Sequence, residues 1–127
     1  MNEADFIRRQ LALERSHLSE ILQAVRRDGA LLENSRAVAD YIEWGSGRLL
    51  ATSAPDPDTR GQLAGLSGAD RAERLLALIA ACSDPVRAEA DRTLGIVQWR
   101  RVAQLSADTI LQERQLYGAA RDAVGPT

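Results

Sequence analysis

Apolar residues recur at helical spacing along most of this 127-residue chain. The clearest stretch covers roughly residues 3–28, where an apolar side chain returns every three or four positions, as one face of an α-helix requires. Its apolar stripe consists of Ile7, Leu11, Leu18, Ile21 and Val25. Acidic residues open this stretch and arginines close it, which suits the helix dipole. Gly29 is expected to supply the C-terminal stop.

The same spacing predicts a second helix from about Asn34 to Thr52, capped by Asn34 or Ser35. Gly45 and Gly47 inside it cost about 1 kcal/mol each relative to alanine. Gly45 lies on the apolar stripe, where a glycine is typical of two closely approaching helices. Residues 54–68 form the longest predicted loop, with one short turn of helix. A third helix begins near Ala69, and its inward residues are expected to be Ala72, Leu75, Leu76 and Ile79.

Two interpretations fit the last third of the chain. Pro85 suits the first position of a new helix, and a further cap at 106–108 predicts a separate helix from Ala107 to Ala123. The alternative is one long, bent helix from Pro85 onward. No stretch has the alternation of a β-strand, and there is no internal repeat. We therefore predict one all-α domain over residues 1–127, an antiparallel up-and-down bundle of four to five helices.

Composition agrees with helices and excludes several functions. Hydrophobic residues make up 45% of the chain and aromatic residues 4%, with alanine and leucine dominant. The net charge is −2 with both signs scattered, so no nucleic-acid binding is predicted. The longest apolar run, 75–82, is too short to cross a membrane, and the first residues lack a signal-peptide pattern. We expect a cytoplasmic protein in which Cys82, the single cysteine, is a buried thiol.

Two carboxylates interrupt the apolar stripes. Glu14 occupies a stripe position of the first helix, and Glu113 occupies the open position of the tail stripe. The other members of that tail stripe are Ile110, Tyr117, Ala120 and Val124. His17, the only histidine, follows Glu14 by three residues, so the two side chains lie on adjacent turns of one face. A carboxylate in an apolar interior is costly unless it is paired or bound to a cation.

Two hypotheses account for these acids. In the structural one, both lie at the edge of their stripes and pair with Arg15, Arg114 or another arginine. In the other, Glu14, His17 and Glu113 bind a metal, helped by Asp108 or Glu20.

At these same residues the chain resembles a known family. Residues 109–120, TILQERQLYGAA, and residues 13–22, LERSHLSEIL, resemble the last and first helices of hemerythrin-like (HHE cation-binding) domains. The resemblance implies a four-helix bundle with His17 and Glu113 in ligand positions for iron or another divalent metal. This chain departs from the family where Thr109 replaces a histidine, Gly118 replaces a proline and Arg48 stands where a carboxylate is expected. With one histidine, the resemblance implies that an oxygen-binding di-iron centre is absent.

The leading functional hypothesis is a non-catalytic bundle without a cofactor, which acts as a homo-oligomer or on a protein partner. Too few polar residues of suitable types converge for catalysis. The metal site is the second hypothesis. The third is a small-ligand pocket lined by Tyr41, Trp44, Trp99 and Tyr117, although aromatic residues at helical spacing are usually core.

Overall fold

A computed structural model describes residues 3–53, 57–81 and 107–125 of the chain. Within these ranges the backbone forms α-helices and no strand, which confirms the all-α prediction. The helices are α1 (Glu3–Arg27), α2 (Ala30–Asn34), α3 (Arg36–Ser53), α4 (Pro57–Ala64), α5 (Gly68–Ala81) and α8 (Ala107–Val124). The predictions for Cys82, Pro85 and Trp99 fall in 82–106, outside the described residues, and so does the choice between one bent helix and two.

The end of α1 corrects the sequence prediction. Gly29 has φ −62° and ψ −22°, an ordinary right-handed conformation, and leads directly into α2. The carboxylate of Asp28 accepts a hydrogen bond from the backbone N–H of Ala30 at 3.1 Å. The Asp28 side chain therefore makes the break between α1 and α2, and Gly29 does not adopt the left-handed conformation that glycine permits. Gly125, after α8, does adopt a left-handed φ of 83° and ends that helix.

The cap of α3 agrees with prediction, and α5 has a serine cap that was not predicted. Ser35 Oγ accepts the backbone N–H of Val38 at 3.3 Å, and Ser67 Oγ accepts that of Asp70 at 3.3 Å. The predicted loop between these helices is more ordered than expected. It contains the eight-residue α4 instead of a single turn, and α4 buries Leu63 against the core to 4% exposure. Pro57 is its first residue, where a missing N–H does no harm.

Arg71 of α5 closes the turn between α4 and α5. Its guanidinium donates hydrogen bonds to the backbone carbonyls of Leu63, Ala64 and Leu66 at 3.0, 3.1 and 2.7 Å. It also donates to Ser46 Oγ on α3 at 3.1 Å. One arginine therefore satisfies the carbonyls that the end of α4 leaves open, and fixes that end to α3.

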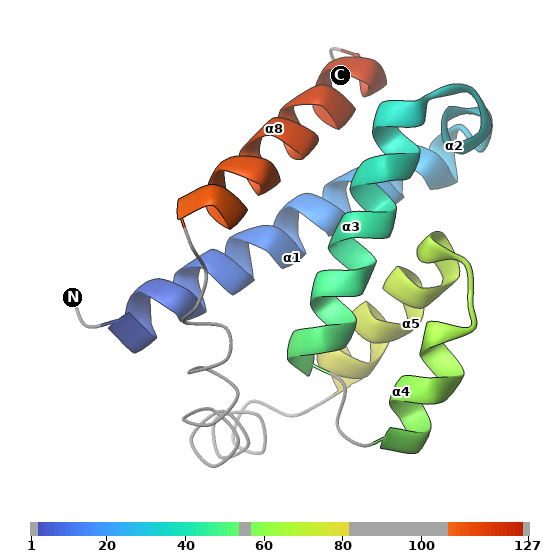
Figure 1. Cartoon of the computed structure of the whole chain (residues 1–127). Helices are drawn as coiled ribbons and strands as arrows, with labels where there is room; N and C mark the ends of the chain where they lie inside the picture. Colours follow the sequence, from blue (N-terminus) through green and yellow to red (C-terminus); the bar gives the residue numbers. More distant parts are fainter. Residues whose placement is uncertain (1–2, 54–56, 82–106, 126–127) are drawn as a thin grey trace.

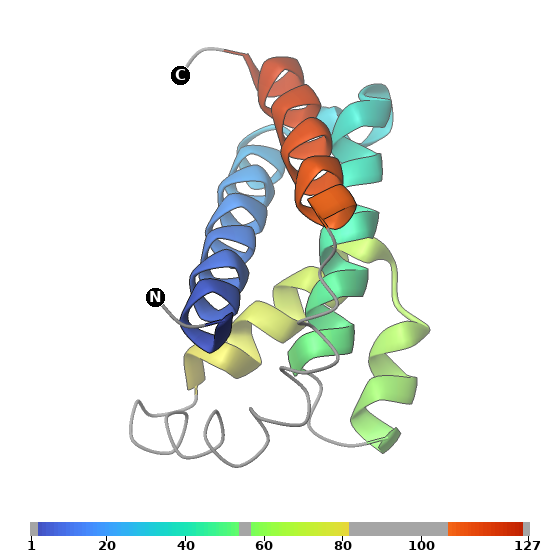
Figure 2. The same ribbon diagram turned by 60° about the vertical axis from the view of Figure 1, so that its left-hand side comes forward.

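The helix directions differ from a simple alternating bundle. α3 contacts α1, α5 and α8, and so occupies the centre (Figure 1). Glu14 and Leu18 of α1 lie opposite Arg48 and Gly45 of α3, which makes α1 and α3 antiparallel. By contrast, α1 and α8 run in the same direction, as both views show (Figures 1 and 2). The up-and-down order is therefore not confirmed over the described residues.

The core lies along the seams of α3 with its neighbours. Its most buried members come from all the longer helices and from α4: Leu18, Ile21, Leu22, Val38, Tyr41, Ile42, Leu49, Leu63, Ala72, Leu75 and Ala120. The close approach expected at Gly45 is confirmed. A Cβ added there would lie 3.1 Å from Leu18 Cδ1 and 3.6 Å from Leu18 Cδ2. Leu18 thus packs onto the bare backbone of α3.

Candidate functional site

Polar side chains meet inside the bundle where α1, α3 and α8 converge. His17 Nδ1 of α1 lies 2.8 Å from Glu113 Oε1 of α8. Glu113 is completely buried, and the side chain of His17 is 19% exposed. Two of the three predicted metal ligands, 96 residues apart in the chain, therefore form a direct pair.

Glu14 is the second buried acid, with 8% exposure. Arg48 Nη2 of α3 donates a hydrogen bond to Glu14 Oε1 at 3.3 Å. Burial raises the pKa of Glu14 above its ordinary 4.5, and the nearby charge of Glu113 raises it further, while Arg48 and His17 act in the opposite direction. The sequence prediction that both acids lie at the edge of their stripes is wrong, since both lie inside. The pairing with another arginine is confirmed for Glu14.

The imidazole of His17 is held from a second side by Tyr117, one turn beyond Glu113. The two rings are stacked, with centroids 3.7 Å apart and planes 5° apart. The Tyr117 hydroxyl donates a hydrogen bond to Glu20, whose other oxygen pairs with Arg121 at 2.9 Å. Burial, followed by the bond to Glu20, raises the pKa of Tyr117. This tyrosine therefore stays protonated and links α8 to α1.

Tyr41 Oη and Glu113 Oε2 are among the buried polar atoms that have no hydrogen-bond partner within the described residues. Tyr41 is completely buried in α3. Burial is the main cause that raises its pKa, followed by the charge of Glu113. The two groups therefore share one low-dielectric interior, in which an unpaired acceptor and an unpaired donor are both costly.

Among the described residues, the aromatic side chains of the predicted pocket pack against one another. The ring centroids of Tyr41 and Trp44 lie 6.2 Å apart, and those of Tyr41 and Tyr117 lie 5.7 Å apart. Trp99 lies outside the described residues. These rings fill space between helices, as aromatic residues at helical spacing usually do.

The predicted metal ligands converge only in part. Glu20 binds Tyr117 and Arg121, and Asp108 is exposed at the start of α8. In the part of the chain that the structure describes, no three His, Cys, Asp or Glu side chains are grouped so as to hold a metal ion. Metal binding therefore stays a hypothesis that depends on the His17–Glu113 pair.

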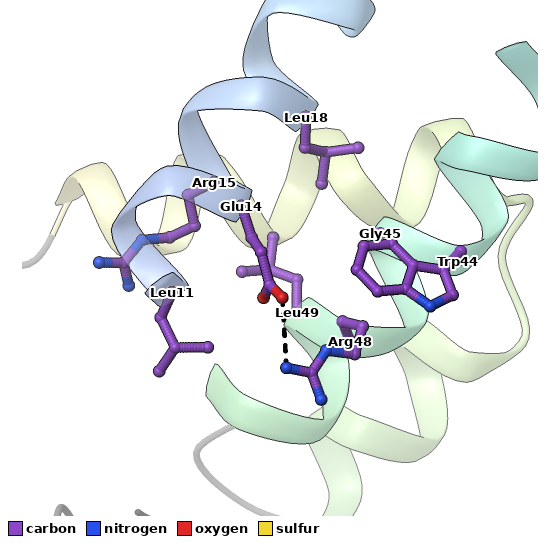
Figure 3. Close-up of a pocket in the computed structure, with 8 residues that line it drawn as sticks. All are labelled: Leu11, Glu14, Arg15, Leu18, Trp44, Gly45, Arg48 and Leu49. Carbon is purple, nitrogen blue, oxygen red and sulfur yellow. Dashed lines mark hydrogen bonds and ion pairs between the residues drawn. The ribbon is translucent and has the colours of Figure 1, made fainter. Parts of the chain in front are cut away.

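A recess opens beside the buried acids, between α1 and α3 (Figure 3). It is shallow and open, with room for little more than one water molecule. Its walls combine apolar and charged side chains: Leu11, Glu14, Arg15, Leu18, Trp44, Gly45, Arg48 and Leu49. Arg48 lies over the Trp44 ring at 5.8 Å and bonds Glu14, whereas the head group of Arg15 points away from both (Figure 3).

Sequence reasoning missed part of this arrangement. In the family resemblance Arg48 is only a departure from the pattern, yet it follows Tyr41 and Gly45 at helical spacing, and this spacing places it on the inward face of α3. Ser46 and Gln10 are also buried, and neither stands out in the sequence. Their burial depends on which neighbour covers them.

Neither a family model, a curated protein nor a solved structure matches this chain. The resemblance to hemerythrin-like domains therefore stays a prediction. Among the described helices, none is long and apolar enough to cross a membrane.

Proposed function

We propose that this protein is a non-catalytic helical bundle that acts by self-association, through a face of α1 formed by Phe6 and Leu13. These two side chains are 44% and 45% exposed. They stand seven positions apart, which is close to two helical turns, so both lie on one side of α1. This pair of exposed apolar side chains on one helix face is the observation that carries the proposal.

The buried charges support a structural role over a catalytic one. Glu113 pairs with His17, Glu14 with Arg48 and Glu20 with Arg121. A general acid or base must reach its substrate within hydrogen-bonding distance. Glu113 has no exposed surface, and its partner histidine is covered by a stacked tyrosine. These pairs fix how α1, α3 and α8 meet.

A second copy of the chain is the proposed partner. A twofold axis that passes α1 midway between Phe6 and Leu13 would relate the two copies. It places Phe6 of each copy against Leu13 of the partner copy. A net charge of −2 opposes such contact only weakly.

Size-exclusion chromatography with light scattering, over a hundredfold range of concentration, tests this proposal. We expect the mass to rise toward two copies. The double variant Phe6→Ser, Leu13→Glu should stay at one copy, while Gln23→Glu, which adds the same charge at an exposed site of α1, should behave as the wild type. A single-copy mass at all concentrations would refute self-association, and a larger heterologous complex in its place would assign the face to another protein.

Metal binding is the second candidate, favoured by the His17–Glu113 pair and the unpartnered Glu113 Oε2 beside it. A carboxylate oxygen and an imidazole are suitable ligands for iron, manganese or zinc. Elemental analysis of protein purified without chelator, with thermal melts in added metal, tests it. About one metal per chain, lost in His17→Gln and retained in Arg114→Gln, would support the site. No bound metal and no thermal shift would remove it.

A further inference from the structure

Arg9 lies on the face of α1 that carries the proposed self-association. It follows Phe6 by three residues and precedes Leu13 by four, so the three side chains share one side of the helix. The side chain of Arg9 is exposed, and among the described residues none forms an ion pair with it. The centre of the proposed association face is therefore a cation that stands between two apolar side chains.

The twofold axis midway between Phe6 and Leu13 also fixes the position of Arg9 in the dimer. Arg9 stands next to the midpoint of residues 6–13, so it lies beside the axis and faces Arg9 of the partner subunit. Two arginines and no acid occur in residues 6–13, FIRRQLAL. Glu14, the first acid after this segment, is buried against Arg48. The partner's segment therefore supplies no carboxylate at the axis, and the two guanidinium groups repel each other.

Building on the proposed self-association, we propose that a tetrahedral oxyanion with two negative charges, such as sulfate or hydrogen phosphate, binds between the two Arg9 side chains and stabilises the dimer. Each guanidinium is a planar fork of N–H donors that binds two oxygens of such an anion side by side. A tetrahedron has twofold axes of its own, so an anion on the dimer axis offers the same pair of oxygens to each subunit. Its two charges balance those of the two arginines.

The apolar contacts beside the axis strengthen this effect. In the dimer, the Phe6–Leu13 contacts lie on both sides of the Arg9 pair and exclude part of the surrounding water. Electrostatic interactions become stronger as water is removed, so the repulsion between the arginines and the attraction of a bound dianion both increase. Self-association should therefore depend on the anion that is present as well as on the ionic strength.

Sedimentation equilibrium of the full chain tests this dependence with sulfate as the probe. Sulfate is raised from zero to about 20 mM while sodium chloride is lowered to keep the ionic strength at about 0.15 M. We expect the dissociation constant of the dimer to fall saturably by about three- to tenfold.

Two variants separate the proposed site from general effects of charge and salt. Arg9→Gln should associate at least as tightly as the wild type in chloride, because the repulsion is gone, and should not respond to sulfate. Arg27→Gln removes the same charge from an exposed site at the far end of α1, and it should respond to sulfate as the wild type does. A response that persists in Arg9→Gln would be a general effect of sulfate on apolar association, and it would overturn the anion site.

A mixture of wild type and Arg9→Glu tests whether Arg9 meets its copy across the axis. In the mixed dimer the two side chains at this position carry opposite charges, whereas in each homodimer they carry like charges. Native mass spectrometry of an equimolar mixture without sulfate should therefore show more of the mixed dimer than random pairing gives.

The outcomes distinguish failure of the anion site from failure of the proposed function. A random distribution of the three dimers would contradict the placement of Arg9 beside the axis, and a dissociation constant that ignores sulfate would remove the anion site. In both cases the self-association itself would stand. A single-copy mass in chloride and in sulfate alike would refute the self-association and the anion site together.

Discussion

Two glycines of α3 allow a direct test of how closely α1 and α3 pack. Gly47 is exposed, and a Cβ added there would meet nothing within 4 Å. Alanine is more favourable than glycine in a helix interior by about 0.8–1.0 kcal/mol. Gly47→Ala should therefore raise the free energy of unfolding by about that amount.

Gly45→Ala gains the same helix propensity but places its Cβ 3.1 Å from Leu18 Cδ1 and 3.7 Å from Leu18 Cγ. Leu18 is 1% exposed, so its side chain has little room to move. Crowding one extra carbon into such a core costs about 1–3 kcal/mol. Subtracting the gain in helix propensity from this cost gives the expected change. Gly45→Ala should lower the free energy of unfolding by between zero and about 2 kcal/mol.

Urea denaturation followed by circular dichroism measures both variants. Leu18→Ala provides the second half of a double-mutant cycle. It costs about 2–5 kcal/mol by itself, but it removes the leucine atoms that the methyl group added at position 45 would meet. Adding Gly45→Ala in that background should therefore be stabilising, as Gly47→Ala is. Equal stabilisation by Gly45→Ala and Gly47→Ala in the wild-type background would refute the close packing.

Three other predictions concern polar groups. Arg71→Gln should cost about 2–4 kcal/mol in urea denaturation, because several charged hydrogen bonds that close the α4–α5 turn are lost. Arg74→Gln, an exposed control on α5, should change stability by less than about 0.5 kcal/mol, and similar losses in both would contradict this role. The pKa of Glu14 is raised, so the folded state binds the proton of this carboxyl group more tightly than the unfolded state does. The stability of the wild type should therefore fall relative to that of Glu14→Gln as the pH rises above 4.5. Urea midpoints of the two proteins that stay parallel from about pH 4.5 to 7 would disprove this. Tyr41→Phe should be neutral or stabilise by up to about 1 kcal/mol, since the buried hydroxyl has no partner among the described residues; a clear loss in thermal melts would show that the hydroxyl is hydrogen-bonded.

The candidate site was accessible from the sequence only in outline. The positions of Glu14 and Glu113 in apolar stripes singled out both acids, but the structural hypothesis placed them at the stripe edges, whereas both are buried. The sequence alone does not predict that His17 pairs with Glu113, because two residues 96 positions apart meet only if α1 and α8 lie side by side. The identity of the Glu14 partner depended on the register of α1 against α3, and this register selects Arg48.

Local rules therefore determined the elements of this protein. Apolar spacing defined α1, α3, α5 and α8, and the predicted cap at Ser35 located the start of α3, because helix periodicity and capping involve residues within one or two turns. Tertiary structure decided the rest. The formation of α2 and the length of α4, the parallel course of α1 and α8, and the partner of each buried charge depend on contacts between distant segments. Such contacts follow from the packing of whole helix faces, and no short stretch of sequence specifies them.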